Sequence, residues 1–170
     1  MPEKLSPHLL TQIGRIVVTA TLVEKLTAFM ASVLMNRRST TAMHIFLSQL
    51  SWRQCVDISD ALAQKRLKKE EAVQFRNILA RAESLMERRN RVVHSLWSWC
   101  WARGTTVRAT RIRFVAKKHK GFRYDVEFLT LKDVKCLADA FDSLLDEYQR
   151  FVRVNWSEAT NFVGESLQQP

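Results

Sequence analysis

The sequence predicts a mainly α-helical protein, a bundle of four or five helices with one β-hairpin inserted before the C-terminal helix. Three prolines and four glycines in 170 residues leave long helices uninterrupted. Apolar residues recur at helical spacing over most of the chain, but between about residues 107 and 129 they alternate, as in strands. We expect a single domain over residues 1–156 and a loosely ordered tail over 157–170.

The first helix is expected to begin at Pro7, with Ser6 as its N-cap. Residues 16–35 form an apolar run with the length of a membrane span. Glu24 and Lys25 fall near the middle of this run, where each charge would cost about 2.5–3.5 kcal/mol in a bilayer. The run therefore predicts a buried core helix and no membrane association.

The following helices have recognisable starts. A short helix is expected over residues 41–50, and Ser51 with Gln54 has the form of a capping box that starts another helix. The third major helix is predicted from about Lys69 to His94. Its apolar stripe consists of Ala72, Phe75, Ile78, Leu79, Ala82, Leu85, Met86, Val92 and Val93, and Leu96 is expected to continue it. Thr130 is the expected cap of the last helix.

The predicted hairpin is strongly basic. Eight lysines and arginines, most of them in the hairpin, lie between residues 102 and 124 without an acid, in a chain whose net charge is +10. Such a segment indicates contact with a polyanion, and a solvated hairpin that keeps the protein soluble is the alternative. Some of the charge is expected to pair across the strands with Asp125 and Glu127. The residues expected to bind RNA are Arg108, Arg111, Arg113, Lys117, Lys118 and Lys120.

The cysteines indicate a reducing compartment. Cys55, Cys100 and Cys136 are odd in number and widely spaced, so they predict neither a disulfide framework nor a metal site. The first residues lack the features of a signal peptide. We expect a cytoplasmic protein without a metal or a cofactor, since Gly-rich phosphate loops and zinc patterns are also missing from the sequence.

A cluster of three polar side chains stands near the end of the third helix. On a helical wheel Arg89 falls near the centre of the apolar arc, and Asn90 lies just past one edge with His94 close behind. Asn90 and His94 are four residues apart and are therefore neighbours. Together the three supply a fixed positive charge, a neutral hydrogen-bonding group and a side chain that titrates near neutral pH. These groups suffice to cleave a phosphodiester bond without a metal.

A structural interpretation competes with this one. A buried, unpaired arginine would cost several kcal/mol, so Arg89 either pairs with a core carboxylate, for which Glu24 is one candidate, or extends its guanidinium towards water. His94 would then be a packing or capping residue near a helix end. What favours the functional interpretation is the presence of Arg, Asn and His within six residues.

The run Arg89-Asn90-Arg91-Val92-Val93-His94 resembles the signature of the HEPN superfamily, in which a histidine follows an arginine after four to six residues. A polar residue directly after the arginine is common in that pattern, and Asn90 stands there. The layout of most of the chain also resembles small members of the superfamily. Ser95 stands where such members often have glycine.

The resemblance implies a helical bundle that forms a homodimer and brings two motifs together across a two-fold axis. For the active branch it implies a metal-independent endoribonuclease, such as a toxin or an anti-phage effector, whose product ends in a 2′,3′-cyclic phosphate. His94 would be the general acid or base, Arg89 would hold the scissile phosphate and offset charge in the transition state, and Asn90 would orient the phosphate or His94. A toxin would also have an antitoxin protein as partner.

Two other functions stay open. In a non-catalytic module, the same residues would bind RNA or a nucleotide, while His94 would transfer no proton. In a structural dimerisation domain, Arg89 would only pair with a core carboxylate. The dimer interface is expected at the third helix or at the segment with Trp97, Trp99 and Trp101, whose indoles would otherwise be available for stacking on bases.

Overall fold

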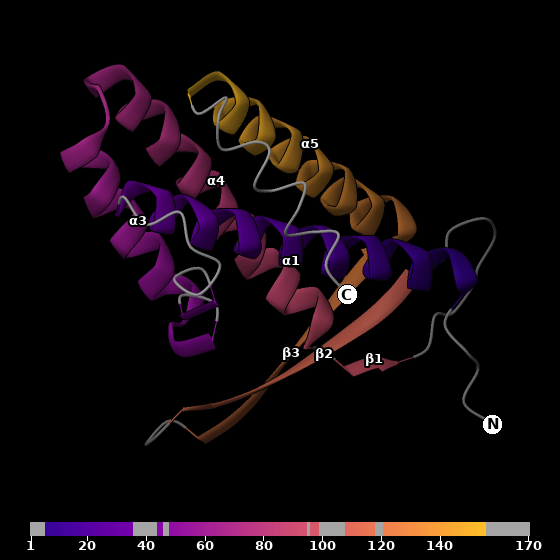
Figure 1. Ribbon diagram of the computed structural model, residues 1–170. Coiled ribbons are helices and arrows are strands. Elements are labelled where there is room, and N and C mark those ends of the chain that lie inside the picture. Colours follow the sequence, from indigo (N-terminus) through magenta and orange to yellow (C-terminus); the bar gives the residue numbers. More distant parts are fainter. Residues whose placement is uncertain are drawn as a thin grey trace. The chain divides into compact units, whose positions relative to one another are not determined.

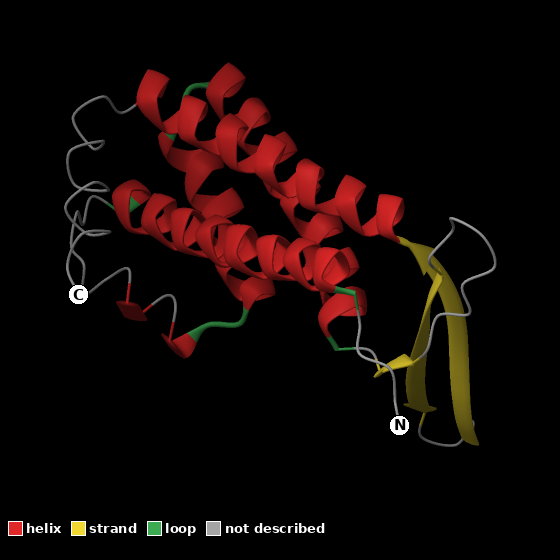
Figure 2. Ribbon diagram, turned by 90° about the vertical axis from the view of Figure 1, so that its right-hand side faces the viewer, coloured by secondary structure: helices red, strands yellow, loops and turns green. Residues whose placement is uncertain are grey.

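The protein is mainly α-helical, with one three-stranded antiparallel sheet (Figures 1 and 2). The computed structural model describes residues 6–35, 44–45, 48–94, 96–98, 108–117 and 121–155, and between residues 96 and 128 the description covers the backbone and its pairing. The described elements are α1 (Pro7–Leu34), α3 (Trp52–Arg66), α4 (Lys69–Val93), β1 (Leu96–Ser98), β2 (Arg108–Lys117), β3 (Gly121–Thr130) and α5 (Leu131–Asn155). The predicted fold class is confirmed.

The expected caps are present. The amide of Leu9 donates to Ser6 Oγ over 3.2 Å at the start of α1. At the start of α3, Ser51 and Gln54 form a reciprocal capping box, as the sequence predicted. Each cap satisfies backbone donors that the first turn of a helix leaves without partners, which explains why short local patterns locate these helix starts.

The last helix begins in the same way. The amide of Asp133 donates to Thr130 Oγ1 over 3.1 Å, and the carboxylate of Asp133 accepts from the amide of Thr130 over 2.7 Å. The hydroxyl of Thr130 also donates to the carboxylate of Asp133 over 2.7 Å. The hydrogen bonds that this carboxylate accepts, first from the hydroxyl and then from the amide of Thr130, lower the pKa of Asp133 because they favour its charged form. Figure 1 shows β3 leading directly into α5, so this cap also fixes the junction between the hairpin and the helix.

The sheet has the order β1-β2-β3. The pairing of β2 with β3 is antiparallel over the full length of both strands, from Arg108 opposite Thr130 to Lys117 opposite Gly121. The strands expected within residues 107–129 are therefore found with shifts of one residue at their ends.

One expectation about the third helix is wrong. α4 ends at Val93, and Leu96 lies in β1 opposite Ile112, so Leu96 does not continue the helical stripe. The sequence predicted no pairing partner for this short segment, because strand pairing depends on residues distant in the chain. Half of the residues of the short helix expected over 41–50 lie outside the described residues, as does the tail 157–170, while residues 44–45 and 48–49 are helical. The single domain over residues 1–156 stays a prediction.

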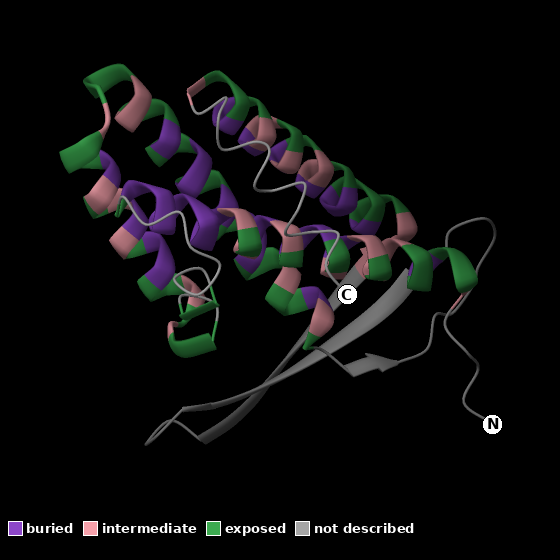
Figure 3. Ribbon diagram, viewed as in Figure 1, coloured by how far each residue is buried: buried purple, intermediate pink, exposed green. Residues whose placement is uncertain are grey.

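The chain divides into two compact units, the first made of Met1–Ala20 with Leu85–Phe141 and the second of Thr21–Ser84 with Asp142–Pro170. Buried and exposed residues alternate along the long helices, as Figure 3 shows. In the first unit the buried apolar residues include Leu9, Ile16, Leu85, Met86, Val92, Val134, Leu137 and Phe141.

The second unit has a dense aromatic core. Phe75 is fully buried and lies edge-on to Tyr148 and stacked against Phe151, at centroid distances of 6.1 and 5.4 Å. The hydroxyl of Thr27 donates to the carbonyl of Val23 over 2.9 Å and is 2.8 Å from the hydroxyl of Tyr148. Since the threonine proton is already used, the tyrosine hydroxyl is the donor in this pair. Burial raises the pKa of Tyr148, so the phenol stays neutral.

By length and composition α1 could cross a membrane, but 61% of its most apolar window is buried in the protein. Core helices of soluble proteins pass the same test, so this property is weak evidence for a membrane protein. Ile16, Ala20 and Val23 are fully buried on α1. Their burial agrees with the predicted core helix.

Candidate active site

Arg89 lies near the end of α4, in the first unit. Its neighbours along the helix at spacings of three and four residues are Leu85, Met86 and Val92, which are all buried. The stripe predicted from the sequence therefore exists, and a charged residue interrupts it. Arg89 itself is half-buried, because its long side chain starts from the apolar face of the helix.

The guanidinium of Arg89 is only partly satisfied. Its Nη1 donates to Asn90 Oδ1 over 3.0 Å. Its Nε is buried and has no hydrogen-bond partner among the described residues. An unsatisfied buried donor costs about 1–3 kcal/mol, and more when the group is charged. The fold thus keeps a donor here at a cost in stability.

No ion pair within the described part of the first unit includes Arg89. An ion pair that is described in this unit joins Arg15 and Asp139. The alternative pairing of Arg89 with Glu24, a residue of the other unit, stays a hypothesis.

Asn90 and His94 lie on the exposed side of the same helix end. The backbone amide of His94 donates to the carbonyl of Asn90 over 3.1 Å, so His94 follows α4 directly and its amide still makes a helical hydrogen bond. The imidazole of His94 makes no hydrogen bond with any residue in the described ranges. His94 is exposed at this end of α4.

The structure brings Arg89 and Asn90 together, but it gives no contact between Arg89 and His94. Five residues on a helix correspond to a rotation of about 140° between the two side chains. One copy of the chain therefore does not direct both groups to the same point from its helix alone. A shared site would need the helix end to bend, or a second copy to supply one of the two groups.

The strand register gives the basic residues of the hairpin different cross-strand partners. Arg111 lies opposite Glu127, and Arg113 lies opposite Asp125. These pairs agree with the expected pairing of charge across the strands. Of the other cations predicted to bind RNA, Arg108 is opposite Thr130 and Lys117 is opposite Gly121, while Lys118 and Lys120 lie outside the described residues.

The tryptophan segment is extended at its start. Trp97 lies in β1 opposite Arg111 of β2. Trp99 and Trp101, which the sequence placed on the same face, lie outside the described residues. The roles expected for these side chains, stacking on bases or forming an interface, stay predictions.

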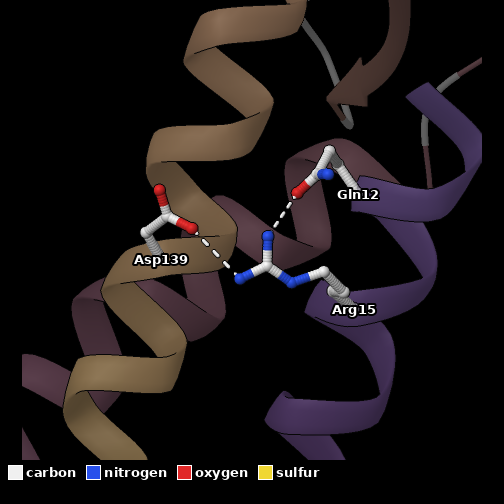
Figure 4. Close-up of polar contacts among 3 residues, drawn as sticks. All are labelled: Gln12, Arg15 and Asp139. Carbon is white, nitrogen blue, oxygen red and sulfur yellow. Dashed lines mark hydrogen bonds and ion pairs between the residues drawn. The ribbon is translucent and has the colours of Figure 1, made fainter. Parts of the chain in front are cut away.

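A polar cluster that the sequence did not predict connects α1 and α5 within the first unit. Arg15 donates from Nη1 to Gln12 Oε1 over 2.6 Å and from Nη2 to Asp139 Oδ1 over 3.0 Å (Figure 4). Gln12 and Arg15 are three residues apart, which a helix brings together. Asp139 is 124 residues further along, and no local pattern could have identified it. Because both charged groups are substantially exposed, this pair contributes at most about 1 kcal/mol.

Cys55, the cysteine of the second unit, is not a reactive nucleophile. Cys55 is buried, and burial raises the pKa of its thiol to about 11. At neutral pH the thiol is therefore protonated, and a protonated thiol is a weak nucleophile and metal ligand. Its neighbour Ser59 uses its own hydroxyl to donate to the carbonyl of Cys55 over 2.7 Å. Among the described residues, no group of three or more His, Cys, Asp or Glu side chains could hold a metal ion.

Comparison with known proteins identifies no relative: no family model, no curated protein and no solved structure matches the chain.

Proposed function

We propose that the protein is a metal-independent endoribonuclease of HEPN type. Arg89 would bind the scissile phosphate, His94 would transfer the proton, and Asn90 would hold the guanidinium in place through the 3.0 Å hydrogen bond from Nη1. The observation that carries this proposal is the buried Nε of Arg89, a donor without a partner among the described residues. A buried donor without a partner does not by itself mark a site, since Trp52 Nε1 is another one among the described residues. What supports a ligand at Arg89 is that the group is charged and that its Nη1 reaches the exposed Asn90, where an anion could approach.

The chemistry is transesterification within the RNA. As general base, His94 would take the proton of a 2′-hydroxyl, whose oxygen then attacks the neighbouring phosphorus. The bond between phosphorus and the 5′-oxygen breaks, and a proton is returned to that leaving oxygen. The guanidinium of Arg89 would offset the negative charge that grows on the phosphate oxygens in the transition state. The products are a 2′,3′-cyclic phosphate and a 5′-hydroxyl.

We further propose that the active form is a homodimer in the cytoplasm. The rotation of about 140° between Arg89 and His94 supports a site built from two copies, in which the arginine of one chain meets the histidine of the other. A toxin or anti-phage effector, held inactive by an antitoxin, is the biological role that the resemblance of the Arg89 to His94 run suggests.

A non-catalytic RNA-binding module is the second candidate. One observation favours it: the imidazole of His94 has no hydrogen bond with the described residues. A catalytic imidazole is usually held in its tautomer and orientation by such a bond. In this module Arg89 and the basic hairpin would bind phosphate, and no bond would be cleaved.

The test is an incubation of the purified protein with mixed RNA in excess chelator, followed by detection of cyclic-phosphate ends. His94→Ala is expected to reduce cleavage by about 10²–10⁴-fold, the usual contribution of a general acid or base. His8→Ala is the matched control, because His8 is another exposed histidine of the first unit, and it should leave the rate unchanged. RNA binding without cleavage by the unmutated protein would replace the enzyme with the binding module.

A further inference from the structure

Positive charge is distributed unevenly along the β2–β3 hairpin. In the half that includes the start of β2 and the end of β3, Arg111 faces Glu127 in the register and Arg113 faces Asp125. Opposite charges at directly opposed positions stabilise a pair of strands. Each of these two arginines therefore has an acid at its directly opposed register position.

The half next to the turn has no such compensation. Lys117 is opposite Gly121, and Arg123 is opposite Val115. Lys117 and Arg123 are diagonal neighbours in this register, a relation that corresponds to roughly 7–8 Å between strand positions. Neither cation has an acid directly opposite it in the register, so a polyanion that binds there meets two positive charges that no cross-strand partner offsets.

Because successive residues of a strand lie on opposite faces, Arg108 lies apart from Lys117 and Arg123. Positions 111, 113 and 117 share one face of β2, and Arg108 belongs to the other. Arg123 falls on the same face as Lys117, because its register partner is position 115. Arg111 also has Trp97 of β1 as its register partner on the other side.

We infer that the hairpin binds the phosphate backbone of RNA through Lys117 and Arg123, whereas Arg111 and Arg113 are structural. This inference rests on the proposed function, in which RNA is the ligand. It reassigns two of the residues that the sequence predicted to bind RNA and adds Arg123 to them. Binding through two backbone cations is independent of base sequence, so the hairpin would hold RNA while the end of α4 acts on it.

The experiment compares two double variants that remove equal charge. Lys117→Gln with Arg123→Gln is the test, and Arg111→Gln with Arg113→Gln is the control. Affinity for a fluorescein-labelled single-stranded oligouridylate is measured between about 50 and 200 mM salt, on the His94→Ala background so that the RNA stays intact. Circular dichroism verifies that each variant is folded.

The first variant is expected to lower the slope of log affinity against log salt by about 1.4, because each phosphate contact of a single strand contributes about 0.7. The second variant should leave the slope unchanged and lower the thermal unfolding midpoint. Equal losses of slope in the two variants would overturn the inference, as would a larger loss in the second.

Exchanged charges give an independent measurement in case the second variant does not fold. Arg113→Asp with Asp125→Arg keeps both the cross-strand pair and the net charge, and it should bind RNA with the unchanged slope. A reduced slope would show that Arg113 itself contacts phosphate. These outcomes do not depend on cleavage: binding without cleavage would remove the proposed enzyme and leave the comparison of slopes valid, whereas no binding at low salt would overturn the RNA-binding inference itself.

Discussion

The core of the second unit and the end of α4 in the first unit use their polar groups in opposite ways. In the core, the hydroxyl of Tyr148 reaches Thr27, whose own proton goes to a backbone carbonyl, so the buried hydroxyls are paired. At the end of α4, the half-buried Arg89 leaves Nε without a partner among the described residues. Trp52 Nε1 in the second unit is also a buried donor without a partner among the described residues, so what sets Arg89 apart is its charge and its place beside Asn90 and His94. We propose that the hydroxyl pair serves the fold and that Arg89 serves a ligand.

The largest expected effect on the free energy of unfolding comes from a substitution that disrupts the core. Phe75→Ala removes a fully buried ring from contact with Tyr148 and Phe151 and should lower the free energy of unfolding by about 3–5 kcal/mol. His94→Ala, a change in an exposed residue directly after the same helix, should alter it by less than about 0.5 kcal/mol. Urea denaturation of both variants measures the two values. A destabilisation of similar size in both would contradict the distinction between the two regions.

A smaller change tests the buried hydroxyl pair. Tyr148→Phe removes the donor to Thr27 and leaves the ring in place, so we expect a loss of about 0.5–1.5 kcal/mol. Thr27 still donates to the carbonyl of Val23 in this variant, which limits the damage. Urea denaturation is again the measurement. An unchanged free energy of unfolding would mean that this hydrogen bond is not used to stabilise the core.

The smallest expected effect is on the pH dependence of stability, and it comes from the carboxylate of Asp133 in the first unit. Hydrogen bonds with Thr130 lower the pKa of Asp133 in the folded protein, so its contribution is present above the unfolded pKa and is lost as the pH falls through the folded pKa. The thermal midpoint should therefore fall more between about pH 6 and pH 3 in the unmutated protein than in Asp133→Asn. Asp146→Asn, at an exposed position of the same helix, is the control and should keep the full pH dependence. Identical pH profiles for the unmutated protein and Asp133→Asn would exclude this role.

Local patterns in the sequence predicted most of the helices. Ser6, Ser51 and Thr130 cap helices where expected, because a cap involves residues only a few positions apart. The stripe that surrounds Arg89 was also predictable from helical periodicity.

Features that depend on residues distant in the sequence were harder to predict. The strand at Leu96–Ser98 and the contact between Arg15 and Asp139 were not predicted. Asp125 and Glu127 were expected to pair with basic residues across the strands, but only the register places Asp125 opposite Arg113 and Glu127 opposite Arg111. The missing partner of Arg89 Nε could not be read from the sequence either, because whether a buried donor is satisfied depends on the packing of the whole site.

The central claim is that Arg89 is kept for a ligand and not for stability, and Arg89→Met tests it most directly. Methionine fills the apolar stripe without a buried donor, so the free energy of unfolding should stay equal or rise by about 1–3 kcal/mol. RNA cleavage by the same variant should fall by about 10²–10³-fold, the usual effect of removing one group that stabilises a transition state. A loss of about 3–5 kcal/mol in stability would instead mean that Arg89 has an ionic partner within the fold, and it would contradict the account.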